Sequence, residues 1–254
     1  MDLKQYRESE TEQKRTDDLM RLINLIPNKG EKVLDIGARD GHFSVLLTEF
    51  YKSVTALDLE KPFISHKNIN CIQGDITSLD FKDNSFDLVF CAEVLEHIPS
   101  HLLQKACSEL SRVSKAELLI GVPYKQDVRV GRTTCYSCGK KNPPWGHVNS
   151  FDKQKLKDLF PLFNINEVSF IGGETEASTN FMSTFLMDLA GNPYGTYSQE
   201  EACIHCGEKL KLPPERSLLQ KIYTRMAFYI NDIQKPFYKT HPNWIHIVLK
   251  KTKA

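Results

Sequence analysis

The first apolar pattern along this chain has the period of a helix. Leu19, Leu22, Ile23 and Ile26 are three or four residues apart, so they fall on one helical face. The helix is expected to end where three residues that disfavour helix follow it, namely Pro27, Asn28 and Gly30. Five short apolar runs come next, and each is typical of a buried strand: 32–37, 53–59, 69–75, 86–94 and 116–124.

Helical segments separate several of these strands. They are expected at 42–50 and 100–113. Strands that are apolar on both faces and alternate with helices predict a parallel sheet that is covered on two sides. The predicted fold class is therefore α/β, a Rossmann-like, doubly wound sheet of seven strands that is mostly parallel, with the last strand antiparallel.

The alternation of strands and helices changes after Tyr124. A helix at 151–160 and a strand at 162–171 continue the core pattern. Residues 244–251 alternate apolar and polar side chains, which predicts a last, antiparallel strand at the edge of the sheet. The chain is expected to divide into a core at 1–124, an insertion at 125–150, a core helix and strand at 151–171, a second insertion at 172–240 and a final core strand at 241–254.

Two parts of the second insertion carry patterns of their own. The helix expected at 215–234 has apolar residues on more than one face: Leu218, Leu219, Ile222, Tyr223, Met226, Phe228, Tyr229, Ile230 and Ile233. It is interpreted either as buried against the sheet or the cysteine motif, or as a pocket wall, a dimer face or a lipid-contacting surface. Residues 170–195 are rich in Gly, Ser and Thr and then apolar, which is interpreted as a gate over the site.

Composition and charge limit the classes of molecule that this chain is expected to bind. Of the 254 residues, 41% are hydrophobic and 26% are charged, which is ordinary for a globular protein. The formal net charge of +1 makes a nucleic-acid partner improbable on electrostatic grounds. The N-terminal sequence lacks the apolar core of a secretory signal, and no stretch approaches the roughly 20 apolar residues of a transmembrane helix. We expect a cytoplasmic protein without a membrane span.

A glycine-containing turn follows the first strand, within residues 33–44. Gly37 and Gly41 lead from Asp35 into a helix whose first N–H groups are free to bind a ligand. Open α/β sheets bind ligands at the carboxyl ends of their strands. Asp58 ends the second strand and Asp75 the third, where a carboxylate accepts hydrogen bonds from ribose hydroxyls or an exocyclic amine. For the glycines alone, a tight turn without a ligand is the alternative.

In order and spacing these segments resemble the class I S-adenosylmethionine (SAM)-dependent methyltransferases, of the type 11 kind. The resemblance covers residues 20 to about 170 and the final strand. It is carried by D-x-G-x-x-x-G at 35–41, ALDLE at 56–60, GDITSLDF at 74–81 and SFDLVFCAEVLEHIP at 85–99. It implies SAM as cofactor, bound by Asp35, Gly37, Ala38, Arg39, Gly41, Asp58, Leu59, Asp75, Ile76, Cys91 and Glu93.

The resemblance also implies a role for each segment. The backbone at 37–41 would hold the methionine part of SAM, with Asp35 bound to its amino group directly or through water. Asp58 would bind the ribose, Asp75 the adenine amine, and Ile76 would lie against the adenine ring.

Arg39 departs from the family, which usually has glycine there. It is expected to fit with φ below zero or with a slight bulge, and its side chain could cover the methionine carboxylate. The same residue breaks the G-x-G-x-x-G pattern of a dinucleotide site.

Two histidines are candidates for chemistry on the acceptor. His97 is the candidate general base if the acceptor is a hydroxyl, because an imidazole titrates near neutrality. The alternative is that His97 only shapes the pocket. His147 is open to three interpretations: ordering its loop, lying behind the substrate, or acting as a spare metal ligand. Glu93 and Glu96 are interpreted as structural or close to the cofactor.

Two C-x-x-C-G motifs, CYSCGK at 135–140 and CIHCGE at 203–208, predict a metal site. Each motif places two thiolates on one metal ion, and its glycine allows the tight turn. Together they predict a closed, structural zinc site with four ligands: Cys135, Cys138, Cys203 and Cys206. The two insertions must then meet in space and clip the fold. A redox role for one pair is the alternative, and His205 is expected to point outwards.

The predicted function is methyl transfer from SAM to an oxygen or nitrogen of a small-molecule or glycan-type acceptor, with the zinc-clipped insertions as a lid. One alternative is an RNA or protein methyltransferase, which rests on the basic residues Lys125, Arg129, Arg132, Lys140 and Lys141. The other is a non-catalytic SAM-binding scaffold, against which the intact Asp35, Asp58 and Asp75 argue.

Overall fold

The computed structural model describes residues 7–27, 30–175 and 178–252. Asn28, one of the predicted helix-ending residues, lies outside these ranges, as do the outermost residues of the predicted first and last core segments. The strands of the main sheet are β1 (Lys32–Ile36), β2 (Ser53–Asp58), β3 (Ile69–Gln73), β4 (Phe86–Ala92), β5 (Ser114–Pro123), β8 (Phe163–Thr175) and β9 (His241–Lys251). The helices are α2 (Glu10–Leu25), α3 (His42–Leu47), α4 (Leu103–Val113), α5 (Lys153–Leu159), α6 (Phe181–Leu189) and α7 (Leu218–Gln234).

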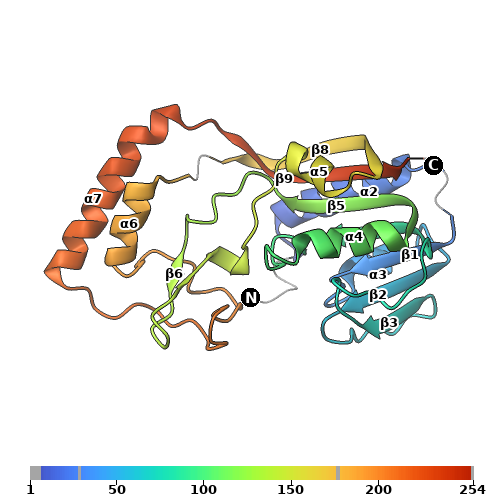
Figure 1. Cartoon of the computed structure of the whole chain (residues 1–254), viewed down its shortest axis with the longest axis horizontal. Coiled ribbons are helices and arrows are strands. Elements are labelled where there is room, and N and C mark those ends of the chain that lie inside the picture. Colours follow the sequence, from blue (N-terminus) through green and yellow to red (C-terminus); the bar gives the residue numbers. More distant parts are fainter. Residues whose placement is uncertain (1–6, 28–29, 176–177, 253–254) are drawn as a thin grey trace.

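The main sheet has seven strands in the order β3-β2-β1-β4-β5-β9-β8 (Figure 1). The first five are parallel, and β9 runs antiparallel to both of its neighbours. The chain builds outward from β1 in one direction and from β4 in the other, so the strand order reverses between these two strands. This is the predicted doubly wound sheet, and its switch point lies where such sheets bind ligands.

The prediction that the last strand lies at the edge of the sheet is wrong. Strand β9 lies between β5 and β8, and β8 forms the edge. The polar residue that gave β9 its alternating pattern, His246, is itself fully buried. Its Nδ1 bonds Oδ2 of Asp18 on α2 at 2.7 Å, so a helix covers the face that appeared to be polar. A satisfied polar side chain inside the protein looks like a solvent-facing one in the sequence.

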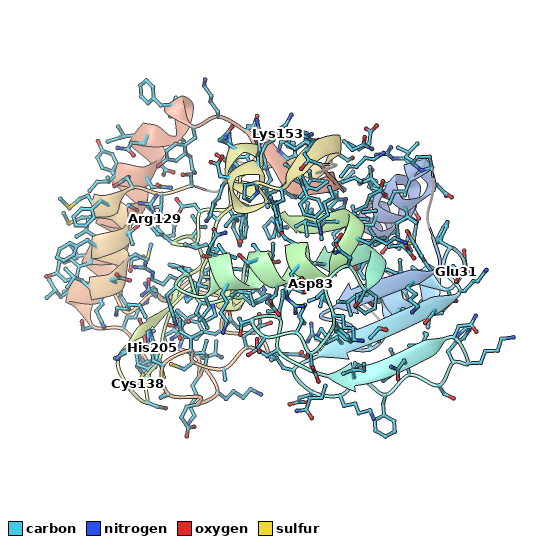
Figure 2. The ribbon with its side chains drawn as sticks, turned by 45° about the vertical axis from the view of Figure 1, so that its right-hand side comes forward. Glu31, Asp83, Arg129, Cys138, Lys153 and His205 are labelled. Atoms are coloured by element: carbon cyan, nitrogen blue, oxygen red, sulfur yellow. The ribbon has the colours of Figure 1, made fainter. Side chains whose placement is uncertain are left out.

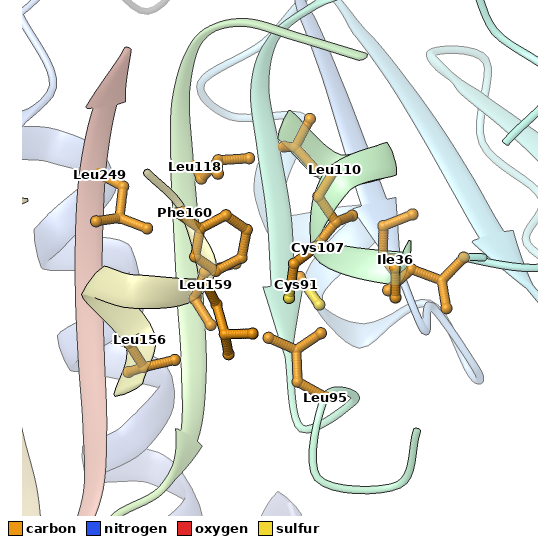
Figure 3. Packing of buried hydrophobic residues seen from close by; sticks show 14 of the residues in the cluster. Ile36, Cys91, Leu95, Cys107, Leu110, Leu118, Leu156, Leu159, Phe160 and Leu249 are labelled. Carbon is orange, nitrogen blue, oxygen red and sulfur yellow. The ribbon is translucent and has the colours of Figure 1, made fainter. Parts of the chain in front are cut away.

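Helices cover both faces of the sheet, as predicted. On one face, Leu110 of α4 and Phe160 at the end of α5 join a cluster that includes Leu118 of β5 (Figure 3). On the other face, Leu22 of α2 packs in a second cluster with Phe90 of β4. Both clusters consist of buried side chains, so the central strands are covered on both sides. This rigid layer fixes the loops at the carboxyl ends of β1, β2 and β4.

The insertions lie at the end of the molecule away from β3 (Figure 1). The first contains a small hairpin of β6 (Thr133–Thr134) and β7 (Lys141–Asn142), followed by the short turn η1 (Pro144–Gly146). The second contains α6 and α7, which pack against each other and not on the sheet, and the short turn η2 (Lys235–Phe237). None of the helices in the described ranges combines the length and apolar character that crossing a bilayer requires.

The structure corrects one expectation about the second insertion and shows a helix that was not predicted. Helix α7 is not buried against the sheet, because only Thr224 and Ala227 of its residues are buried. Several of its apolar side chains are exposed: Leu218, Leu219, Ile222, Met226, Phe228, Tyr229 and Ile233. The segment 170–195 forms the end of β8 and the unpredicted helix α6. Helix α6 begins where the Asn180 side chain accepts a hydrogen bond from the N–H of Ser183, a cap that the glycines upstream obscured.

Candidate active site

The loop between β1 and α3 has the backbone shape that the glycine pattern predicts. Gly37 and Gly41 have φ of 77° and 82°, in the left-handed region. A Cβ at Gly37 would lie 2.4 Å from Cγ2 of Val94, and one at Gly41 would lie 2.5 Å from Cδ1 of Ile64. Neither position therefore admits a side chain. The N–H groups of Gly37 and Ala38 donate to the carbonyl of Leu57, which fastens this loop to the end of β2.

Arg39 does not have the negative φ that we expected, since its φ is 42°. The left-handed backbone directs its N–H at the Asp58 carboxylate, with 2.9 Å between N and Oδ2, and this bond offsets the strain. The guanidinium is largely exposed, and one of its nitrogens lies 3.7 Å from Oε2 of Glu200 in the second insertion. Arg39 thus links the loop, to which its backbone belongs, with the second insertion, which its side chain approaches.

Asp35 is buried at the base of the loop. Its Oδ2 accepts a hydrogen bond from the hydroxyl of Ser44 on α3 at 2.5 Å. Burial raises the pKa of this carboxyl to about 7, against the lowering effect of the Ser44 bond and with smaller contributions from Asp58 and Asp40. A cationic amino group bound beside Asp35 would favour its ionised form.

A pH-dependent stability follows from the raised pKa of Asp35. The folded chain keeps a proton that the unfolded chain loses above 3.8, so the free energy of unfolding falls as pH rises from 3.8 through about 7. Asp35→Asn removes this penalty, and without ligand the variant is expected to be more stable than the parent at pH 8. Each kcal/mol corresponds to roughly 2–4 °C in Tm for a chain of this size. Scanning calorimetry at pH 5 and pH 8 tests this, and an equal Tm difference at both values would contradict the assignment.

Two further carboxylates lie at the ends of the neighbouring strands. Asp58, at the end of β2, accepts hydrogen bonds from the N–H groups of Arg39 and Leu59. Asp75 follows β3 and is exposed, with Oδ1 bound to the N–H of Thr77 at 2.7 Å. Ile76 beside it is buried. Because β1, β2 and β3 are parallel neighbours, Asp35, Asp58 and Asp75 share one end of the sheet.

Of the two residues at the end of β4 that were predicted to contact the cofactor, Cys91 lies in the core and Glu93 in the loop that follows. Cys91 is fully buried and packs in the cluster that contains Cys107 (Figure 3). Its predicted contact with a cofactor could therefore come only from its backbone. Glu93 has φ of 58°, and its Oε2 pairs with Arg15 at 2.8 Å and accepts from the indole of Trp244 at 3.3 Å. Its side chain is held by the N-terminal helix and β9.

The loop after β4 lies against the end of the first insertion, so three side chains from these two segments come together. Glu96, His97 and His147 each place a ligand-type atom within 4.8 Å of the others. The two rings meet edge to face with centroids 4.7 Å apart. The N–H groups of Val148 and Asn149 donate to the carbonyl of Glu96 at 2.8 and 3.1 Å, which joins the end of the first insertion to this loop.

The charges in this cluster are suppressed by burial. Desolvation, and then the Glu93 charge, raise the pKa of Glu96 well above its ordinary value. Although His97 as a residue is exposed, desolvation and the Arg39 charge lower the pKa of its imidazole to about 4. Desolvation and His97 lower the pKa of His147 to about 3. Glu96 was predicted to be structural or close to the cofactor and not to take part in chemistry. The sequence feature that could have indicated such a role is the Glu-His pair directly after a parallel strand.

The four motif cysteines form one cluster, so the two insertions do meet as predicted. The Sγ atoms of Cys135 and Cys206 are 3.7 Å apart, as are those of Cys138 and Cys203. All four sulfurs lie within 4.8 Å of one another. Ligands at about 2.3 Å from a tetrahedral metal are separated by roughly 3.8 Å, whereas a disulfide needs about 2.05 Å. The spacing therefore suits metal coordination and not a disulfide.

The two cysteine turns have the same backbone geometry. Gly139 donates to the carbonyl of Cys135 at 2.7 Å, and Gly207 donates to that of Cys203 at 2.9 Å. Both glycines have φ of 74°. The N–H of Cys138 lowers the pKa of the Cys135 thiol to about 6, against the raising effect of burial and with a smaller lowering effect from the N–H of Ser137. The N–H of Glu208 lowers the pKa of Cys206, but burial and hydrogen bonds with the other three thiols outweigh it and raise this pKa to about 12. The cluster thus favours a thiolate at Cys135, and thiolate is the form in which cysteine binds metal.

His205 lies beside this cluster and not within it. Its Nε2 lies 3.1 Å from the carbonyl oxygen of Lys141 on the other insertion, and the ring is exposed, as expected. Figure 2 places Cys138 and His205 in the same corner of the molecule, at the end of the insertions away from the sheet. The cluster thus lies apart from the carboxylates at the strand ends.

Comparison with known proteins identifies the core. Residues 34–118 match the family described as Methyltransferase domain. The chain carries a SAM-dependent methyltransferase domain.

Individual relatives agree with this family. The chain is 29% identical over 178 residues to a demethylmenaquinone methyltransferase of Staphylococcus epidermidis, which covers 57% of this chain and 73% of the relative. The crystal structure of the YcgJ protein of Bacillus subtilis has a TM-score of 0.56 at 15% identity, over 94% of this chain and 99% of that one. The structure of a 1,6-didemethyltoxoflavin-N1-methyltransferase of Burkholderia thailandensis, with bound S-adenosylhomocysteine, has a TM-score of 0.57 at 11% identity. The match covers 98% of this chain and 83% of that one. The methyltransferase domain therefore has the fold that sequence analysis predicted.

Proposed function

We propose that this methyltransferase transfers the methyl group of SAM to an oxygen or nitrogen of a small-molecule or glycan-type acceptor. The observation that supports the cofactor site best is the set of carboxylates Asp35, Asp58 and Asp75 at adjacent strand ends, beside a loop that admits no side chain at Gly37 or Gly41. The loop backbone would hold the methionine part of SAM, Asp58 the ribose, and Asp75 with its neighbour the adenine.

The small-molecule part of the proposal has two supports. Relatives of known specificity carry names that refer to small acceptors, demethylmenaquinone and 1,6-didemethyltoxoflavin. In addition, two of the five basic residues on which the RNA alternative rests form ion pairs within the protein. Arg129 pairs with Asp127 and bonds the carbonyl of Thr179, and Arg132 pairs with Asp188 at 3.0 Å. Cations that are already paired contribute little to binding a phosphate backbone.

We also propose that the four cysteines hold a structural zinc ion. Four thiolates fill the tetrahedral shell and leave no open position for catalysis. The sulfur spacing and the matched turns described above fit this ion, and they fit a reducing compartment such as the cytoplasm, where free thiolates persist. The zinc would fasten the insertions at the mouth of the site. The backbone N–H of Trp145 in the first insertion donates to Oε1 of Gln199 in the second at 2.6 Å.

The acceptor class can be tested with labelled SAM. Purified protein is incubated with methyl-labelled SAM and extracts of its own cells, which are then separated into small-molecule, glycan and lipid, protein, and RNA fractions. Label in the small-molecule or glycan fraction is the expected result. Label in RNA or protein would overturn the acceptor class and leave the methyltransferase intact. No label anywhere, with SAM binding shown by calorimetry in the same preparation, would favour the non-catalytic scaffold.

His97 is proposed to act on the acceptor and not on SAM. His97→Ala is expected to lower kcat by roughly tenfold or more, while the Kd for SAM changes less than threefold. His101→Ala is the matched control, because this histidine is exposed in the turn before α4. Unchanged turnover in His97→Ala would remove His97 from the chemistry.

A further inference from the structure

We propose that Glu96, His97 and His147 bind one divalent metal ion beside the cofactor loop, in addition to the ion at the four cysteines. Each residue offers one ligand atom, and these atoms lie within 4.8 Å of one another. One carboxylate and two imidazoles form the set that Mn²⁺, Fe²⁺ and Zn²⁺ accept in proteins, with further positions left for water or substrate.

The burial of Glu96 is the main argument. The residue is 0% exposed, and neither carboxylate oxygen has a hydrogen bond from another described residue. A buried carboxylate without partners is unfavourable unless it is protonated, paired with a cation or bound to a metal. Nearby Glu93 adds a second buried oxygen, Oε1, that has no partner among the described residues. The site therefore places three buried acceptor oxygens, which have no hydrogen-bond partner among the described residues, beside two imidazoles.

His147 is oriented as a metal ligand would be. Its Nδ1 lies 2.7 Å from Oε1 of Gln126, and a carbonyl oxygen can only accept, so Nδ1 carries the proton. Nε2 is then the nitrogen with a free lone pair. Histidine ligands in metal sites are commonly held in this way, with the other ring nitrogen donating to a carbonyl or carboxylate.

The ligands are held in place by backbone and amide bonds between distant segments. The Asn149 amide donates to the carbonyls of Leu95 and Ile98 at 3.0 and 2.6 Å. Its Oδ1 accepts from the hydroxyl of Ser100 at 3.0 Å. Together with the bonds from 148 and 149 to the Glu96 carbonyl, these contacts fix His147 against the loop after β4. A preformed set of ligands loses little entropy when a metal binds.

The position of this cluster connects it with the reaction. Val94 in the same loop packs against Gly37 of the cofactor loop, and the Arg39 charge is near enough to affect His97. An ion here would hold an acceptor oxygen close to the cofactor. This part of the inference rests on the proposed function, whereas metal binding itself does not.

If an ion binds here, the chemistry favours a hydroxyl compound as the acceptor. A hydroxyl bound to a divalent cation loses its proton to solvent more readily, because the cation stabilises the alkoxide or phenolate. The oxygen then forms a bond to the methyl carbon as the carbon–sulfur bond of SAM breaks, and the sulfonium becomes a neutral thioether. The open ligand positions would orient the oxygen for this in-line transfer.

Titration of the full, zinc-loaded protein with Mn²⁺, followed by electron paramagnetic resonance, tests the site. Mn²⁺ suits carboxylate and imidazole and competes poorly for four thiolates, so the cysteine cluster does not interfere. Wild type is expected to bind about one Mn²⁺ per chain. Glu96→Gln and His147→Gln are expected to weaken its affinity at least tenfold, and His101→Gln is the control. Retained SAM binding in each variant shows that its fold is intact.

The possible outcomes separate the metal site, its link to the acceptor and the proposed function. Wild type that binds no Mn²⁺, or variants that bind it like wild type, would refute the site. Mn²⁺ binding without any effect on methyl transfer would retain the site and refute its link to the acceptor. Mn²⁺ binding in a protein that methylates no fraction at all would instead count against the proposed function.

Discussion

Cys203→Ser is expected to abolish methyl transfer while SAM binding survives in part. The four cysteines hold two insertions whose apolar core around the sulfurs is small, since among the described residues this cluster consists of Cys135, Tyr197, Cys203 and Leu210. Such a core does not stabilise a fold without a metal or cross-link, and zinc binding supplies the folding energy directly. Loss of one thiolate therefore leaves the two insertions joined by weaker contacts, such as the Arg132–Asp188 ion pair and the bond from Trp145 to Gln199.

Turnover depends on these insertions through His147. The residue lies at the end of the first insertion, and its neighbours bond the loop that carries His97. The SAM-binding loop depends on them less, because its bonds run from residues 37–39 to the end of β2 within the core. We therefore expect turnover to fall below detection and the Kd for SAM to rise by less than about tenfold.

The measurement combines zinc content with turnover and SAM binding. Wild type is expected to contain about one zinc per chain by mass spectrometry, and Cys203→Ser much less. Cys71→Ser is the matched control, since Cys71 lies on β3 outside the cluster and its Sγ contacts only the carbonyl of Ile64 in a hydrogen bond. Full activity in a metal-free preparation would refute a structural role for zinc.

Asp58→Asn is expected to weaken SAM binding by about a hundredfold. The variant keeps an oxygen that can accept from the N–H of Arg39, so the loop retains its shape. It loses the negative charge that would accept hydrogen bonds from the ribose hydroxyls, and charge-assisted hydrogen bonds contribute about 1.5–3 kcal/mol each. Loss of roughly 2.7 kcal/mol corresponds to two orders of magnitude in Kd.

Isothermal titration with SAM and with S-adenosylhomocysteine checks this effect. Both ligands contain the ribose, so both affinities are expected to fall by the same factor. Glu60→Gln is the control, because Glu60 is exposed two residues beyond Asp58. An Asp58→Asn variant with wild-type affinity for both ligands would remove Asp58 from the cofactor site.

Sequence alone determined the elements of the core and the shape of the cofactor loop. The strands β1, β2, β4 and β5 follow from short apolar runs, because a strand that is buried on both faces needs no polar position. Gly37 and Gly41 marked the loop, since only glycine tolerates both the positive φ and the close contacts found there. The meeting of the cysteine motifs was also predictable, because four equivalent thiolates suit a single ion.

Local patterns failed where distant segments decided burial. His246 looked solvent-facing until Asp18 of α2 was seen to bond it, so β9 was misplaced at the edge. Helix α7 looked like a core helix from its apolar content, yet it packs on α6 and leaves most of those side chains exposed. Arg39 looked incompatible with a positive φ until the Asp58 carboxylate was found to hold its N–H.

The cluster of Glu96, His97 and His147 was decided by tertiary structure alone. Glu96 and His97 follow β4, whereas His147 comes from the end of an insertion far along the chain. No local period or spacing connects His147 with the Glu96-His97 pair. They meet because the N–H groups of Val148 and Asn149 need an acceptor, and the carbonyl of Glu96 provides it. The sequence therefore determined the methyltransferase domain, and only the fold determined which side chains meet beside the loop after β4, because these come together through long-range hydrogen bonds.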